Sequence, residues 1–140
     1  MSRAVNILCL SGGGYRGLFT AQILTQLQAH YKFNDFREHF DLIIGTSTGG
    51  LIASALMCGV APSEIAKNFK DYGKDVFRPL GSVRKMAKFL TGVGSYSQAP
   101  LINIICEVLG ENKDKFIEDL EFAREERTCH LALVALSRAS

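Results

Sequence analysis

The chain has 140 residues, and its 16 lysines and arginines against 14 aspartates and glutamates give a formal net charge of +2 at pH 7. Hydrophobic residues make up 47% of the chain and charged residues 21%. This composition predicts a folded core and excludes a disordered or nucleic-acid-coating segment. At this length we expect one domain or part of one, and the absence of a signal-peptide pattern or of a long apolar run favours a cytoplasmic protein.

The cysteines are too widely spaced for a metal ribbon or a dense disulfide framework, because none belongs to a Cys-x-x-Cys pair. Each lies in an apolar stretch, where a free thiol behaves as a small hydrophobic residue. We therefore expect buried free thiols, and no metal or cofactor, for the four cysteines Cys9, Cys58, Cys106 and Cys129.

Two strand-and-helix units open the chain. Residues 5–10 form a short apolar run that predicts a buried strand, and apolar residues then recur at helical spacing from Gly17 to about Tyr31. A second buried strand is expected at 40–44, and a helix at 51–58 with Gly59 as its stop. This alternation predicts parallel strands, whose carboxyl ends meet at one edge of the sheet.

The pattern is less regular further along. Pro62 opens another predicted helix, with Ser63 as a candidate cap and an end near Gly73. A helix is expected at 100–109 and a third buried strand at 130–136. A three-stranded parallel sheet with its last strand this close to residue 140 predicts the first part of a larger α/β domain.

The pentapeptide Gly45-Thr46-Ser47-Thr48-Gly49 fits the pattern Gly-x-Ser-x-Gly between a strand and a helix. A nucleophile elbow needs small residues two before and two after the serine, because strand and helix approach closely there. The helix N-terminus would also favour an anionic intermediate at Ser47. The alternative is a glycine-rich turn with an N-capping serine.

The earlier motif, Gly-Gly-Gly-Tyr-Arg-Gly at residues 12–17, also follows a strand and precedes a helix. It fits a dinucleotide fingerprint, but that site needs an acid after the second strand, whereas Asp41 begins it and Ser47 follows it. The other interpretation is an oxyanion loop that turns backbone N–H groups toward a carbonyl attacked by Ser47. Its candidate residues are Gly12, Gly13, Gly14 and Arg16, the last being equally compatible with a surface ion pair.

Together the two motifs resemble the patatin-like phospholipase family, which combines a Gly-Gly-Gly-x-Arg-Gly loop with a following Gly-x-Ser-x-Gly. The resemblance implies a three-layer α/β/α domain with a mainly parallel sheet, of which residues 1–140 are the N-terminal part. It also implies a serine acyl hydrolase with a Ser–Asp dyad, acting on phospholipids or related lipid esters without a cofactor. Ser47 would be the nucleophile, and the elbow would consist of Gly45, Thr46, Thr48 and Gly49. The oxyanion loop would be formed by Gly12, Gly13, Gly14 and Arg16. Some bacterial members degrade membranes when a nucleotide signal activates them.

One part of the family pattern is missing. The catalytic aspartate of the family lies in an Asp-Gly-Gly or Asp-Gly-Ala turn, and no aspartate of this sequence is followed by glycine. Asp41 is a poor substitute, because the strand that it begins would separate it from Ser47 by roughly 13–20 Å. A different triad would need His30, His39 or His130, which lie in a polar connection or at the start of a strand.

Residues 67–88 carry seven lysines and arginines against two aspartates. Either this is a solvated helix face, or it rests on anionic lipid headgroups near the mouth of the lipid site and acts as a lid. In the second case we expect transient membrane contact, and in neither case binding to nucleic acid.

Two other classes of function remain open. Because the chain keeps the elbow and lacks the base, it could be a binding or assembly module whose open sheet edge pairs with the missing C-terminal half or with another copy. A nucleotide-binding α/β domain would bind nucleotide at the first glycine loop.

Overall fold

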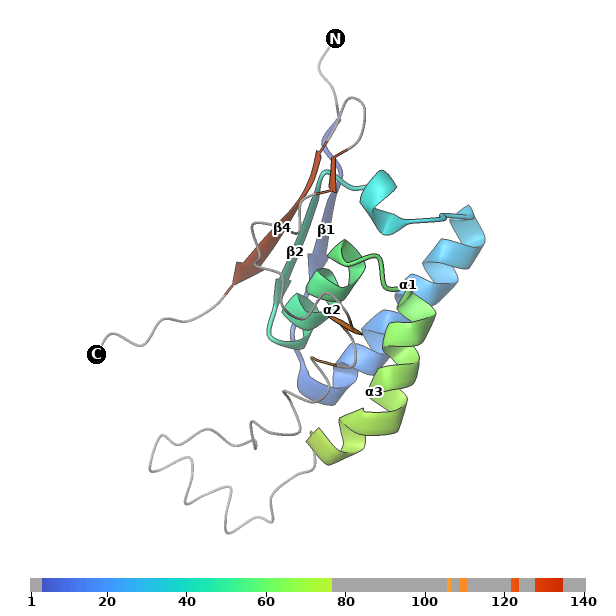
Figure 1. Cartoon of the computed structure of the whole chain (residues 1–140), viewed down its shortest axis with the longest axis vertical. Helices are drawn as coiled ribbons and strands as arrows, with labels where there is room; N and C mark the ends of the chain where they lie inside the picture. The colour runs from blue at the N-terminus through green and yellow to red at the C-terminus, as the bar shows by residue number, and fades with distance from the viewer. Residues whose placement is uncertain (1–3, 77–105, 107–108, 111–121, 124–127, 135–140) are drawn as a thin grey trace, which may run out of the picture.

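The computed structural model describes residues 4–76, 106, 109–110, 122–123 and 128–134. Two strand-and-helix units come first, followed by a third long helix and two further strands (Figure 1). In chain order the elements are β1 (Ile7–Leu10), the 3-10 turn η1 (Gly14–Arg16), α1 (Gly17–Tyr31), the 3-10 turn η2 (Phe36–Glu38), β2 (Leu42–Thr46), α2 (Thr48–Met57), α3 (Pro62–Val76), β3 (Phe122–Ala123) and β4 (Thr128–Val134).

The four described strands form one sheet in the order β1-β2-β4-β3. The central strand β2 runs parallel to both β1 and β4, whereas β3 is antiparallel to β4. In the register, Gly45 lies between Leu10 of β1 and Leu133 of β4. The predicted α/β class with a mainly parallel sheet is therefore confirmed. The strand β3 was not predicted, because two residues are too few to show a periodicity.

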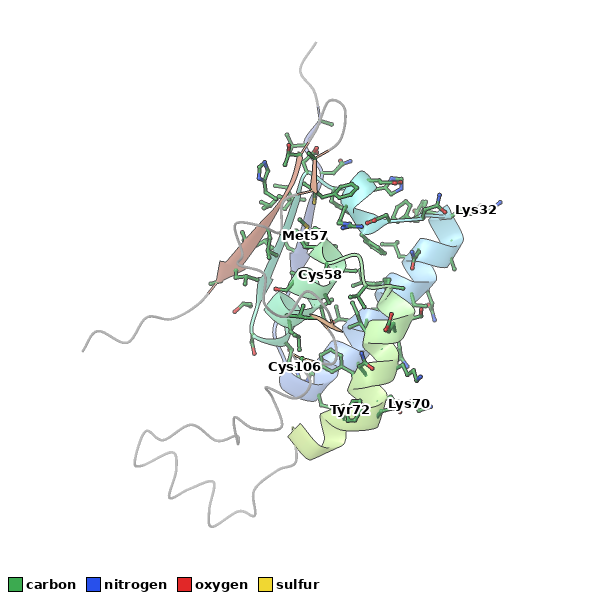
Figure 2. All side chains as sticks on the ribbon, viewed as in Figure 1. Lys32, Met57, Cys58, Lys70, Tyr72 and Cys106 are labelled. Carbon is green, nitrogen blue, oxygen red and sulfur yellow. The ribbon has the colours of Figure 1, made fainter. Side chains whose placement is uncertain are left out.

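The described helices lie on one face of the sheet. Figure 1 shows α2 between the sheet and the pair formed by α1 and α3. Met57, which is labelled in Figure 2, is the last residue of α2. On this face its sulfur atom lies 3.6 Å from the sulfur atom of Cys129 of β4. On the other face Ile7 and Val134 are 52% and 59% exposed. Within the described residues the helices thus supply one of the two outer layers implied by the resemblance.

The core is apolar and lies between the sheet and the helices. In α3, Ile65 and Phe69 are four residues apart and fully buried, as expected for the inner stripe of an amphipathic helix. In α1 the corresponding residues are Ala21 and Leu24. The two helices pack against each other, and the ring of Phe69 lies 3.0 Å from where a Cβ atom of Gly17 would be.

Most predicted boundaries agree with the structure within a few residues. The helix predicted from Gly17 to Tyr31 has those bounds, and Gly59 ends α2 with a φ of +79°. The cap predicted at Ser63 is wrong, because α3 already begins at Pro62, where a proline fits the first helical position. The helix also continues past Gly73 to Val76. Of the helix predicted at 100–109, only residues 106 and 109 belong to the described part of the chain, and both are helical.

The expectation of buried thiols is correct for only part of the set. Cys129 is buried and Cys58 is half-buried, but Cys9 and Cys106 are exposed, and none of the four forms a disulfide. Cys9 occupies the face of β1 that points away from α2, next to the exposed Ile7 in the strand alternation. An apolar run in the sequence does not reveal which face of a strand the helices cover.

Arg37 in η2 connects three separate parts of the chain. Its guanidinium donates to the carboxylate of Asp35, with 2.5 Å between Nη2 and Oδ2, and to the carbonyl oxygen of Met57 at the end of α2 (3.2 Å). It also lies 4.3 Å from the centre of the Phe122 ring. Burial alone would raise the pKa of Asp35, but the hydrogen bonds from the side chain and backbone of Arg37 and its positive charge outweigh burial. The pKa of Asp35 therefore lies below its usual value of 3.8.

This shift predicts the acid sensitivity of the fold. A carboxylate with a lowered folded pKa stabilises the protein above its unfolded pKa, and this contribution is lost as the pH falls through the folded pKa. Asp35→Asn should therefore lower the free energy of unfolding near pH 6 and reduce the further loss between pH 5 and pH 2.5. Urea unfolding at several pH values measures both effects, with Asp71→Asn at an exposed position of α3 as the matched loss of one carboxylate. If the free energy of unfolding of Asp35→Asn fell as steeply with acid as that of the wild type, the lowered pKa of Asp35 would not be its cause.

Candidate active site

Ser47 lies between the end of β2 and the start of α2, and its side chain is exposed. Its backbone has φ 53° and ψ −128°, a conformation that non-glycine residues rarely adopt. Such strain persists only where the surrounding structure imposes it, and it is concentrated at functional sites. Here it raises the serine above the turn, as the geometry of a nucleophile elbow requires.

The two glycines of the elbow are required by close backbone contacts. A Cβ atom at Gly45 would overlap the backbone of Gly49 and Gly50, and a Cβ atom at Gly49 would overlap the carbonyl of Leu10. These contacts join the end of β2 and the end of β1 to the first turn of α2. The pattern Gly-x-Ser-x-Gly therefore has a direct steric reason in this fold.

The first glycine motif lies directly against Ser47. A Cβ atom at Gly12 would come within 2.7 Å of Ser47 Cβ and 3.4 Å of Ser47 Oγ. The two motifs, which are 35 residues apart in the sequence, are thus neighbours at the carboxyl end of the parallel strands. Gly14 has φ 58°, so the loop turns here in a way that favours glycine.

Thr48 connects the two motifs by a hydrogen bond that the sequence did not predict. The backbone N–H of Gly13 donates to Thr48 Oγ1 over 3.1 Å, and Thr48 is only 5% exposed. The N–H of Gly13 is therefore directed at Thr48, which leaves Gly12 and Gly14 as the remaining candidate donors of this loop. The one signal in the sequence was a hydroxyl next to the serine, and a threonine is also common in ordinary turns.

The start of α2 adds a favourable electrostatic environment. The N–H groups of Gly50 and Leu51 donate to the carbonyl of Ser47, at 2.9 and 3.2 Å. Helix geometry leaves the preceding N–H groups, those of Thr48 and Gly49, without a partner in the helix, and the positive end of the helix dipole lies there. An anion that forms on a substrate carbonyl beside Ser47 would be stabilised at this position.

Arg16 and the start of α1 form the surroundings of the loop. The side chain of Arg16 is exposed and extends along Gly13, with Arg16 Cβ 3.3 Å from where a Cβ atom of Gly13 would lie. An open depression of about 500 Å³ lies beside it. Its lining residues, which do not include Ser47, are Gly13, Gly14, Tyr15, Arg16, Leu18, Phe19 and Gln22.

Asp41, His39 and His130 lie at the opposite end of the sheet from Ser47. Asp41 precedes β2 and binds the start of β1, with 2.9 Å between its Oδ2 and the backbone nitrogen of Asn6. His130 pairs with Leu42, the first residue of β2. The ring of His39 stacks on the ring of Phe33, with 3.9 Å between the ring centres. None of these three residues is placed to accept a proton from Ser47, which follows the other end of β2.

Two further properties concern the described residues as a whole. No three histidine, cysteine, aspartate or glutamate side chains in this part of the chain gather into a group that could hold a metal ion. None of its helices is both long and apolar enough to cross a membrane. Lys67 and Lys70 of the basic stretch are exposed on α3, and the residues of that stretch from 77 onward lie outside the described part.

Comparison with known proteins agrees with the geometry. The family model for patatin-like phospholipases matches residues 8–135. A cGAMP-activated phospholipase from Escherichia coli is 35% identical over 112 residues, covering 76% of this chain and 31% of that protein. Patatin-like protein 2 from Arabidopsis thaliana is 37% identical over 127 residues, covering 78% of this chain and 30% of the plant protein.

An animal enzyme is also similar to this chain. An intracellular phospholipase A2 from Caenorhabditis elegans is 30% identical over 126 residues, which is 86% of this chain and 12% of that protein. The chain therefore spans less than a third of the length of these curated relatives.

The steric contacts of the elbow predict different losses of stability when two adjacent glycines are replaced by alanine. Gly49→Ala should destabilise the fold by roughly 3 kcal/mol or more, because backbone atoms must move to admit the methyl group. The free energy of unfolding of Gly50→Ala should stay within about 1 kcal/mol of the wild-type value. The new Cβ atom would lie 3.4 Å from its nearest neighbours, and alanine favours a helix. Urea unfolding of both variants measures the difference, and equal stabilities would contradict the close contact with β1.

Proposed function

Since this chain belongs to the patatin-like phospholipase family, we propose that Ser47 is the nucleophile of a serine acyl hydrolase that cleaves phospholipids or other lipid esters. The observation that carries the proposal is the strained backbone of Ser47, with φ 53° and ψ −128°, next to Gly12 of the oxyanion loop. A strained, exposed serine beside a glycine loop has a clear use in acyl transfer.

In the proposed reaction Ser47 Oγ attacks the ester carbonyl carbon and loses its proton to a general base. The tetrahedral oxyanion is held by backbone N–H groups, from Gly12 and Gly14 in the loop and from Thr48 after the nucleophile. Collapse breaks the bond to the alcohol, which takes up a proton and leaves an acyl-Ser47 ester. Water then attacks this ester, releases the fatty acid and restores the serine.

The general base is the aspartate of a Ser–Asp dyad, as the family resemblance implies. No aspartate of this sequence is followed by glycine, and Asp41 binds the backbone of Asn6 at the far end of β2. The dyad aspartate would therefore come from a part of the protein outside residues 1–140. In this proposal the chain supplies the nucleophile, the elbow and the oxyanion loop.

The depression beside the loop suits a lipid ester. Leu18 and Phe19 supply an apolar surface for an acyl chain, and the Arg16 guanidinium supplies a positive charge for an anionic headgroup. The exposed lysines of α3 would add a weak attraction to an anionic membrane surface, worth about 1 kcal/mol for each cation close to it. We therefore propose a cytoplasmic enzyme that contacts membranes transiently.

Phosphonylation by an alkyl fluorophosphonate tests the proposal. Ser47 Oγ would form a bond to phosphorus, fluoride would leave, and the hydroxyl proton would pass to the base or to solvent. We expect the mass of one phosphonyl group on the wild-type chain and none on Ser47→Ala. Ser54→Ala is the matched control, because the hydroxyl of Ser54 donates to the carbonyl of Gly50 within α2.

Labelling that persists in Ser47→Ala would remove Ser47 as the nucleophile. If the wild-type chain reacts only after extension toward the length of its relatives, the site needs the remainder of the protein. If neither form reacts at Ser47, the hydrolase proposal is wrong.

A second candidate function is a binding or assembly module of the same fold. The observation that favours it is the exposed apolar face of the sheet, where Ile7 and Val134 are 52% and 59% exposed. Exposed apolar surface of this kind is typical of an interface.

For this alternative we expect an unreactive chain that self-associates, and Ile7→Lys should shift it toward the monomer in sedimentation velocity. Lys67→Glu on α3 is a surface control on the helix side of the sheet. A monomeric chain that is labelled at Ser47 would exclude the module.

A further inference from the structure

Thr48 is a polar residue that the fold buries beside the site. Its exposed fraction is 5%, and among the described residues it is the one polar or charged residue in the buried class. Buried polar groups are costly unless they are hydrogen-bonded, so the partner of this hydroxyl is informative. That partner is the backbone N–H of Gly13, 35 residues away in the sequence, over 3.1 Å.

The side chain of Thr48 is also confined sterically. Thr48 Cβ lies 3.4 Å from where a Cβ atom of Gly17 would be, and the ring of Phe69 closes the same position at 3.0 Å. Phe69, a residue of α3, is fully buried, and its ring lies beside Gly17 at the start of α1. Thr48 therefore lies beside the start of α1, and its hydroxyl is directed at the glycine loop.

Two consecutive residues of the loop meet two consecutive residues of the elbow. Gly12 lies against Ser47, and Gly13 is bonded to Thr48. Within the loop, the N–H of Arg16 donates to the carbonyl of Gly13 (3.2 Å) and closes the turn η1. A run of three glycines has little conformational preference of its own, so the loop needs a fixed contact with the elbow to hold one position.

We propose that Thr48 is a positioning residue whose hydroxyl holds Gly13 and thereby fixes the N–H groups of Gly12 and Gly14 toward the carbonyl attacked by Ser47. The inference rests on the proposed hydrolase function, which it deepens. The side chain of Thr48 touches no reacting atom and acts through the loop. A displacement of about 1 Å at a reacting centre can reduce the rate about 100-fold, so one hydrogen bond at this place has a large effect on catalysis.

A purely structural role for Thr48 gives a different expectation. The hydrogen bond would then contribute to folding alone, and its loss would leave the reactivity of the folded protein unchanged. The two roles are separated by the rate of labelling at saturating probe, kinact, and by the probe concentration that gives half of this rate, KI.

The test is saturation kinetics of fluorophosphonate labelling for Thr48→Val, which keeps the shape and removes the hydroxyl, and for Thr48→Ser, which keeps the hydroxyl. We expect kinact to fall about 10- to 100-fold in Thr48→Val with KI unchanged, and to stay within about threefold of the wild type in Thr48→Ser. Thr25→Val is the matched control, because its hydroxyl donates to the carbonyl of Ala21 within α1 (2.8 Å). Amide hydrogen exchange at Gly13 should accelerate in Thr48→Val alone.

Several results would overturn the inference. A wild-type kinact in folded Thr48→Val would do so, as would equal losses in Thr48→Val and Thr48→Ser. If Thr48→Val does not fold, Thr48→Ala replaces it, and equal rates for the alanine and serine variants would again contradict the role of the hydroxyl. If only the extended form of the protein reacts at Ser47, the same variants are compared in that form. Failure of both forms to react at Ser47 would instead count against the proposed hydrolase, on which the inference depends.

Discussion

Leu10 at the end of β1 and Gly49 in the first turn of α2 lie so close that the carbonyl of Leu10 occupies the space of a side chain at residue 49. The same turn of α2 contacts Gly45 of β2, so two neighbouring strands end on one turn of helix. Because no side chain separates these backbones, the loop after β1 and the loop after β2 must share a small volume. Ser47 adopts its strained conformation within this volume, and Gly12 is brought against it.

The two ends of the sheet have different tasks. At the carboxyl end the glycine loop, the elbow and the start of α2 gather backbone N–H groups around an exposed serine. At the amino end the polar groups bind one another, as when Asp41 accepts the N–H of Asn6. Arg37 similarly joins η2 to the last turn of α2, near the buried contact of Met57 and Cys129. In the proposed enzyme, these contacts at the two ends of α2 would keep its first turn in place for the attack by Ser47.

The family model matches residues 8–135, which include both the glycine loop and the elbow. The described helices cover one face of the sheet, and the chain spans less than a third of the length of relatives such as the Escherichia coli and Arabidopsis thaliana proteins. In the proposed enzyme, this chain supplies the groups whose action depends on backbone geometry. A general base can be supplied by any suitably placed carboxylate, whereas an elbow and an oxyanion loop require particular glycines.

Local patterns in the sequence determined the α/β class, the bounds of α1 and the identity of both motifs. Periodicity and glycine spacing are local properties, so residues 12–17 and 45–49 could be interpreted before any contact was known. The exposure of Cys9 and Cys106 and the strand β3 were missed, because each depends on what packs against that segment. Only the tertiary structure decided that Gly12 touches Ser47 and that Thr48 binds Gly13, because these contacts join residues 35 apart across a parallel sheet.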